Sequence, residues 1–455
     1  MRDLAFVGFL VALFALGLRR PFLFVLAFAY IDTVAPQRLS YYLLNSLPLS
    51  MIFGCLSIGG WLLFEKKDGI RFTVRQTLLA ILLCYTFYTT ANADFPIEAA
   101  EKWDWASKAL IFAMFLPLTL RSKLRIEAVI LFLTLSAAAI IIVGGLKTVA
   151  SGGGYGVLNL MVTNNSNLYE SSTISTVAIA LIPVILWLAR FGTVFPPDWR
   201  VKLFAAGLVF ACLLMPIGTE ARTGLVCIGV LALLMLRDVK RRILYLAGAT
   251  LLTLGSVPFL PESFTGRMST IQGYQSDNSA GVRLAVWAWT WNYAQENPMG
   301  GGFGAYRQNK IEVKTVATEV SGGVETVTAR TSLDESRAYH SSYFEMLGEQ
   351  GFPGLILFLL IHGAGLFRLE VLRRRYRKSE GDDAWIAPLA TAIQHFMIIC
   401  LVGSLFVGIA YQPFPWLMFA VGIGLDTYLA RRSRTAARKP FLPPQAVSSR
   451  ASALS

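Results

Sequence analysis

The run IEAVILFLTLSAAAIIIVGG (residues 126–145) carries one charged side chain in twenty positions. An α-helix needs about 20 mostly apolar residues to cross the hydrocarbon core of a bilayer. Further apolar runs, separated by short charged links, fill most of the chain, and 55% of all residues are hydrophobic against 15% charged. We therefore predict an all-α polytopic membrane protein, because a bilayer admits only helices and closed barrels.

The apolar runs predict 12 or 13 transmembrane helices. The number depends on residues 4–31, where Arg19, Arg20 and Pro21 divide an apolar region into two spans or one broken span. The other expected helices cover residues 49–64, 77–93, 106–120, 126–145, 173–189, 203–217, 225–236, 243–258, 351–367, 386–410 and 416–430. Together they form a single membrane domain of residues 1–434. A basic, then Pro- and Ser-rich cytoplasmic tail (435–455) is predicted to be disordered.

The net charge of +13 does not indicate a nucleic-acid partner, because of where the basic residues lie. Seven clusters between alternate pairs of apolar runs hold 27 of the 41 Lys and Arg residues. Basic links of this kind face the cytoplasm. One long polar segment, residues 259–350, has seven Lys or Arg against ten Asp or Glu, and its parity puts it on the opposite side. We predict that it is an extracytoplasmic loop, with short helices, laid over a membrane-embedded site.

The sequence offers no metal-binding or cofactor-binding motif. All five cysteines lie within apolar runs, so no disulfide framework is expected. The chain has no DxD pair, no HExxH and no GxSxG motif, and no Cys or His stands at metal-ligand spacing from His340. We expect no metal and no cofactor. Chemistry on the outer face would then use arginines to neutralise an anionic leaving group.

Arg222 is the first candidate catalytic residue. It stands in GTEARTG (218–224), a tight turn at the outer end of two apolar runs. An arginine at that depth is costly, so it faces a water-filled cavity or has a partner. A snorkelling interfacial arginine, or an ion pair with Glu220, explains the same pattern without a catalytic role.

Arg283 is the second candidate. Trp287 and Trp291 follow it at i+4 and i+8, which predicts an amphipathic helix resting at the membrane interface with its aromatic face down. The guanidinium would then reach a phosphate near the headgroup plane. That phosphate belongs either to a substrate or to an ordinary membrane lipid.

His340 is the third candidate, as the only histidine predicted on the outer side. An imidazole with a near-neutral pKa is the usual group to take a proton from an attacking hydroxyl. A surface histidine without a function is the alternative. Lys147, Asn164 and Asn165 lie at an outer helix end, where they would bind sugar or phosphate or cap the helix beginning near Tyr169.

The sequence resembles the O-antigen ligase and polymerase superfamily of bacterial inner-membrane glycosyltransferases, over about residues 72–430. Three signatures carry the resemblance: GTEARTGL (218–225), RLAVWAW with ENPMGGGFG (283–304), and HSSYFEMLGEQGFPGL (340–355). The opening region, with DTVAPQRLSYYL (32–43), further resembles a branch of O-glycosylation ligases that accompany exosortase-type systems. The glycines of GGGFG are expected to form a turn that folds the loop back, because no βαβ context surrounds them.

The resemblance implies a GT-C-like fold and a metal-independent, inverting transfer of a glycan from undecaprenyl diphosphate to a hydroxyl of a lipid, protein or glycan acceptor. The reaction would take place among membrane lipids on the periplasmic face of the bacterial inner membrane. By motif, His340 would act as general base or position the acceptor, and Arg222 and Arg283 would hold the diphosphate. Glu349, in the third signature, would have a structural or orienting role in the substrate-binding site. Glu220 departs from the serine that the family often has there, and its carboxylate would partly neutralise Arg222.

Two other functions are compatible with parts of this pattern. A polymerase of the same superfamily, whose acceptor is another lipid-linked repeat, fits the loop equally well. A lipid-glycan transporter fits less well, because transporters show repeat symmetry and mid-membrane charges, whereas the candidate groups here lie at one face.

Overall fold

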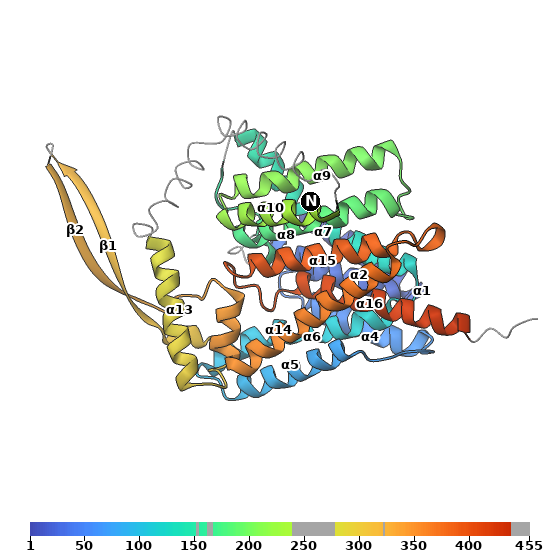
Figure 1. The fold of residues 1–455 in the computed structure, drawn as a ribbon, viewed down its shortest axis with the longest axis horizontal. Helices are drawn as coiled ribbons and strands as arrows, with labels where there is room; N and C mark the ends of the chain where they lie inside the picture. Colours follow the sequence, from blue (N-terminus) through green and yellow to red (C-terminus); the bar gives the residue numbers. More distant parts are fainter. Residues whose placement is uncertain (152–153, 162–166, 239–277, 322–323, 438–455) are drawn as a thin grey trace, which may run out of the picture.

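The computed structural model describes residues 1–151, 154–161, 167–238, 278–321 and 324–437. Within these ranges the chain is a bundle of α-helices lying side by side (Figure 1), which confirms the predicted all-α fold. Five of the described helical segments are long and apolar enough to cross a membrane, so this is a multi-pass membrane protein. They are α7 (Lys123–Ser151), α8 (Ser171–Phe191), α9 (Trp199–Gly218), α14 (Ser342–Tyr376) and Gly381–Gly403, which contains α15 (Ile386–Gly403).

The other bundle helices are shorter or carry more charge. They are α1 (Arg2–Arg19), α2 (Phe22–Val34), α3 (Pro36–Leu39), α4 (Leu49–Phe64), α5 (Val74–Ala91), α6 (Pro96–Thr119), α10 (Arg222–Met235) and α16 (Pro413–Ala437). Residues 4–31 thus form two helices rather than one broken span, with Arg20 and Pro21 between them. The expected helix over residues 243–258 lies outside the described residues, as does the tail beyond residue 437.

Helix α8 lies at the centre of the bundle. Its side chains are buried almost continuously from Thr173 to Ile185, and it packs against α7, α9, α10 and α15. At the periphery, α9 exposes large apolar side chains such as Leu203 and Phe210. Apolar side chains on the outer surface of the bundle are compatible with contact to lipid, because lipid tails are as apolar as the protein interior.

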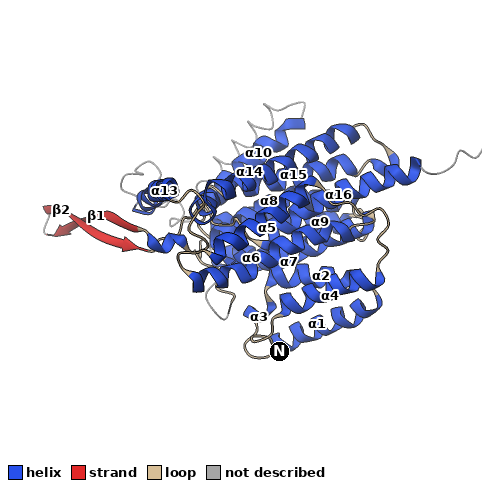
Figure 2. Cartoon of the chain, turned by 90° about the horizontal axis from the view of Figure 1, so that it is seen from below, coloured by secondary structure: helices blue, strands red, loops and turns tan. Residues whose placement is uncertain are grey.

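The two ends of the bundle differ in charge. At the end that we call the basic end, arginines of the links and helix termini pair with carboxylates, as in Arg125 with Glu65 (2.7 Å) and Arg237 with Glu370 (2.9 Å). The segment between residues 278 and 342 lies at the opposite end (Figure 2), which we call the loop end. The structure therefore separates the basic links from the long polar segment, as their charges indicated.

The loop end contains the helix expected around Arg283 and a β-hairpin that was not predicted. Helix α13 (Asn278–Glu296) lies across the end of the bundle, and an antiparallel hairpin of β1 (Lys310–Ser321) and β2 (Val324–Glu335) projects away from it (Figure 1). Lys310 pairs with Glu335 at the base of the hairpin. The signal was present as Val- and Thr-rich runs on both sides of SGG (321–323), a pattern typical of hairpins.

Two boundaries also differ from the predicted ones. Helix α14 begins at Ser342 rather than at Gly351, so the polar segment ends earlier than expected. The helix continues through a kink at Gly351, whose φ of +62° an L-residue rarely adopts. Helix α16 runs to Ala437, three residues into the predicted tail.

Candidate functional site

A cavity of about 790 Å³ lies at the loop end, where α8, the α9–α10 turn and α13 meet. Arg222 and Arg283, which are 61 positions apart in the sequence, both line it. The polar residues that share the cavity are Ser171, Ser172, Thr219, Glu220 and Thr223, and Trp287 contributes an aromatic ring. The structure thus brings two of the three candidate catalytic residues to one space.

The position of Arg222 is determined by a well-anchored turn. Arg222 is the first residue of α10, and Glu220, with a φ of +52°, makes the reversal from α9 possible. The carbonyl of Gly218 accepts the backbone N–H of Tyr155 at 2.7 Å, and the hydroxyls of Ser175 and Thr219 are 2.7 Å apart. At the N-terminus of a helix, the backbone dipoles add positive potential to that of the guanidinium, which favours an anion in the cavity.

Arg283 is positioned by the tryptophans on its own helix. The ring of Trp287 stacks on Phe344 with centroids 4.9 Å apart and planes within 6° of parallel. Trp291 meets Phe352 edge-on at 5.8 Å. The aromatic face that we expected to rest on the membrane therefore contacts α14 of the same chain, and this packing fixes how far Arg283 extends over the cavity.

His340 lies beside Arg283, immediately before α14, with a left-handed φ of +49°. The adjoining Ser342 is tied to the link before α16, since its N–H donates to the carbonyl of Ser404 and its hydroxyl to that of Val407, both at 2.8 Å. Partial desolvation by surrounding protein atoms, followed by the positive charge of Arg283, lowers the pKa of His340 below its ordinary value. The imidazole is therefore mostly neutral at pH 7 and able to accept a proton.

Glu170 is a charged neighbour of this site that the sequence analysis missed. Its carboxylate accepts hydrogen bonds from the N–H (2.6 Å) and hydroxyl (2.7 Å) of Thr173 and so caps α8. It also opposes the lowering of the pKa of His340. An acidic residue followed three positions later by the first buried helical residue is a weak capping signal, and nothing local connects it to a histidine 170 positions away.

The predicted substrate-binding residues are placed differently. Lys147 is exposed on α7, its Nζ 4.5 Å from the ring centroid of Tyr155, and it is not among the residues that line the cavity. Asn164 and Asn165 lie outside the described residues. Their proposed roles stay predictions.

Glu349 is fully buried and faces away from solvent. Its Oε2 lies 2.7 Å from Nζ of Lys102, and its Oε1 accepts the N–H of Gly304 at 3.1 Å. Lys102 also pairs with Glu345 at 2.6 Å. This charged triad holds the glycine turn onto α6 and α14, which gives Glu349 a position beneath the loop rather than on the surface of the cavity.

The glycine turn folds the loop back, as expected. The N–H of Gly301 donates to the carbonyl of Gly348 (3.1 Å) and that of Gly302 to the carbonyl of Glu349 (2.9 Å). Asp94 donates its N–H to the carbonyl of Gly301 at 2.9 Å and accepts a hydrogen bond from the hydroxyl of Tyr293. The turn thereby joins the end of α5 to α13 and α14.

Among the residues that the structure describes, no group of three or more His, Cys, Asp or Glu could hold a metal ion.

Comparison with known families divides the chain in two. Residues 1–193 match a family of unknown function (DUF5935), and residues 207–359 match the O-antigen ligase family. No curated protein matches the chain. The second match includes Arg222, Arg283 and His340 and both elements that carry the arginines into the cavity. The match over residues 207–359 supports a place for this part of the chain in the O-antigen ligase-like superfamily of membrane proteins.

Proposed function

We propose that this protein is a membrane glycosyltransferase that transfers a glycan from undecaprenyl diphosphate to an acceptor hydroxyl at the loop end of the bundle. The observation that carries the proposal is the convergence of Arg222 and Arg283 on one cavity, with His340 beside Arg283. The match of residues 207–359 to the O-antigen ligase family supports the same reaction class.

The two guanidinium groups are suited to a diphosphate. Each presents a planar fork of donors that matches two phosphate oxygens. The cavity volume of about 790 Å³ falls within the range of sites that enclose a small ligand. We assign it to the diphosphate and the first sugar, while the polyprenyl chain would extend into the bilayer.

The reaction then needs one base and one displacement. Neutral His340 accepts the proton of the acceptor hydroxyl while the hydroxyl oxygen forms a bond to the anomeric carbon. The bond from that carbon to the diphosphate oxygen breaks, and the electron pair stays on the diphosphate, where Arg222 and Arg283 neutralise the new charge. Because attack and departure occur on opposite faces, the anomeric configuration inverts.

The basic end faces the cytoplasm in this proposal, which places the cavity on the periplasmic side of the bacterial inner membrane. The acceptor is a hydroxyl of a lipid, protein or glycan. We favour a ligase over a polymerase because the family that matches residues 207–359 is described as O-antigen ligase.

An in vitro transfer assay tests the arginines. The purified protein in lipid nanodiscs receives undecaprenyl-diphosphate glycan and acceptor, and product is measured for the wild type, Arg222→Lys and Arg283→Lys. We expect each variant to lose about 100-fold in turnover, the scale of removing one donor from a developing anion. Arg307→Lys is the matched control, because Arg307 lies in the same loop, 3.4 Å from Glu98, and is not among the residues that line the cavity.

The same assay tests His340 with two substitutions. His340→Ala removes the base, whereas His340→Asn removes the base but tolerates the left-handed backbone at this position. Both should abolish transfer while lipid-glycan binding persists. Turnover retained in His340→Asn but lost in His340→Ala would show that the backbone conformation matters and the imidazole does not.

Deletion in the native host separates ligase from polymerase. Loss of a ligase leaves complete lipid-linked polymer without conjugate. Loss of a polymerase leaves conjugates that carry one repeat.

A further inference from the structure

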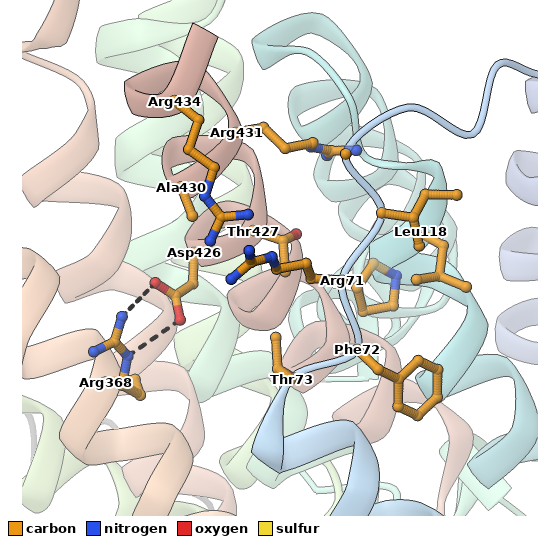
Figure 3. Close-up of a pocket in the computed structure, with 13 residues that line it drawn as sticks. Arg71, Phe72, Thr73, Leu118, Arg368, Asp426, Thr427, Ala430, Arg431 and Arg434 are labelled. Carbon is orange, nitrogen blue, oxygen red and sulfur yellow. Dashed lines mark hydrogen bonds and ion pairs between the residues drawn. The ribbon is translucent and has the colours of Figure 1, made fainter. Parts of the chain in front are cut away.

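An arginine-lined cavity of about 200 Å³, far smaller than the first, lies at the basic end (Figure 3). It lies between the segment leading into α5 and the later turns of α6, α14 and α16. Four arginines line it against a single carboxylate, that of Asp426; the arginines are Arg71, Arg368, Arg431 and Arg434.

Asp426 is already fully occupied. Arg368 places its fork on both carboxylate oxygens, with Nη2 2.7 Å from Oδ1 and Nε 3.1 Å from Oδ2. Arg75, which is buried, forms a second ion pair with the same carboxylate. The single negative charge of Asp426 is therefore shared by Arg75 and Arg368, and it does not compensate the other arginines of the cavity.

The remaining arginines keep their charge uncompensated. Arg431 donates to the carbonyl of Leu120 at 2.6 Å, a neutral acceptor. Within the described part of the chain, neither Arg71 nor Arg434 has a carboxylate, carbonyl or aromatic partner. Figure 3 shows both of their side chains extending into the cavity. Like charges that share one small space repel each other, so an anion bound between them would be stabilised.

The surroundings of the cavity indicate where that anion comes from. Pro117 and Leu118 form an apolar side of the cavity, and Phe72 beside Arg71 is 55% exposed. An exposed aromatic ring next to a guanidinium, at the charged end of a membrane helix bundle, suits the boundary between acyl chains and headgroups.

We propose that this cavity binds a phosphate group, supplied by the headgroup of an anionic phospholipid. The guanidinium groups of Arg71 and Arg434 donate hydrogen bonds to the phosphate oxygens, and Arg431 contributes a further positive charge to the cavity. The bound headgroup joins the segment before α5 to the end of α16, two parts of the chain more than 350 positions apart.

Binding is tested on purified, delipidated protein in a neutral detergent. The probes are short-chain phosphatidylglycerol, short-chain phosphatidylcholine and inorganic phosphate. The readouts are the unfolding temperature and the bound mass in native mass spectrometry. We expect phosphatidylglycerol, and not phosphatidylcholine, to bind and to raise the unfolding temperature of the wild type. Arg71→Gln combined with Arg434→Gln should weaken that binding at least about tenfold, because two charge-assisted contacts are lost.

The matched control is Arg20→Gln combined with Arg377→Gln. It removes two exposed charges from the same end of the protein without touching the cavity. This pair should bind phosphatidylglycerol like the wild type. Equal weakening in both pairs, or none in the first pair, would overturn the proposal, because binding would then follow net charge alone.

Inorganic phosphate distinguishes the source of the ligand. Millimolar phosphate could raise the unfolding temperature of the wild type but not that of the Arg71/Arg434 variant. The cavity would then be a phosphate site whose ligand is soluble rather than a lipid headgroup. Mass spectrometry detects bound lipid independently of stability. If the double variant unfolds, Arg434→Gln alone replaces it in the binding test, because Arg434 lies in the exposed last turn of α16.

Discussion

The indole N–H of Trp287 donates a hydrogen bond of 2.8 Å to the carbonyl of Tyr339. Trp287 lies one helical turn after Arg283, and Tyr339 is the buried neighbour of His340. This bond therefore connects the helix that carries the proposed diphosphate ligand to the backbone that carries the proposed base. A hydrogen bond of the cavity-lining Trp287 thus helps to set the distance between the two functional groups.

Trp287→Phe should slow transfer without unfolding the protein. Phenylalanine keeps the stacking on Phe344 but removes the donor, at a stability cost of about 0.5–1.5 kcal/mol. We expect turnover to fall between about tenfold and 100-fold, since small displacements of reacting groups are costly. Trp289→Phe is the control, because Trp289 lies two positions further along the same helix and stacks on Tyr293. Equal turnover in the two variants would contradict the positioning role.

The pH profile of transfer should report His340. Desolvation and Arg283 disfavour the protonated imidazole, so its pKa lies below the ordinary value and activity should persist below about pH 6.5 before the acid limb begins. Arg337→Gln removes a positive charge, raises this pKa and moves the limb to higher pH. Glu170→Gln removes a negative charge, lowers the pKa and moves the limb to lower pH.

Both shifts should shrink in high salt, because the neighbouring charges act partly through solvent. Glutamine retains an oxygen acceptor for capping α8. Shifts of the same sign in both variants would show that another group controls the acid limb.

Transfer should continue in excess EDTA. The proposed chemistry neutralises the leaving diphosphate with Arg222 and Arg283 and requires no divalent ion. The measurement is the initial rate after chelation and desalting, compared with the same protein supplied with Mg²⁺ or Mn²⁺. A rate that falls to background and recovers with metal contradicts the arginine scheme.

Lys102→Met should strongly destabilise the loop end. Lys102 pairs with the buried carboxylates of both Glu345 and Glu349, which are 9% and 0% exposed. Removing one partner of a buried ion pair costs about 3–5 kcal/mol. Lys108→Met on the same helix breaks an exposed i,i+4 pair with Asp104, where about 0–1 kcal/mol is expected. Thermal unfolding of the two variants should separate them clearly, and similar values would show that the triad is not needed for stability.

Two alanine substitutions in the glycine turn separate backbone strain from steric contact. Gly302 and Gly304 have φ values of +75° and +83°, so alanine costs about 1–2 kcal/mol at either position. A Cβ at Gly302 would also lie 2.4 Å from Cβ of Ala93, whereas at Gly304 its nearest neighbour would be 3.6 Å away. Gly302→Ala should therefore be the more destabilising by about 1–3 kcal/mol. Equal unfolding temperatures would mean that the turn does not pack on α5 as tightly as described.

Much of the fold was predictable because it depends on local properties of the chain. Apolar length marks each helix, and the position of basic links marks one end of the bundle. The helix around Arg283 and the turn before Arg222 were likewise visible in short patterns. The Val- and Thr-rich runs between residues 310 and 335 also indicated a hairpin. We predicted short helices there instead, because the surrounding segments are helical in hydropathy.

The sequence by itself therefore determined the class of protein, the helices and the residue types available for chemistry, because these follow from interactions within a few turns of the chain. Only the tertiary structure decided which distant groups meet. Lys102 and Glu349 are 247 positions apart, and no local pattern pairs them. Burial of Glu349 beside Lys102, and the placement of Arg222 and Arg283 on one cavity, both arise from packing between helices, where long-range contacts compensate charge and define space.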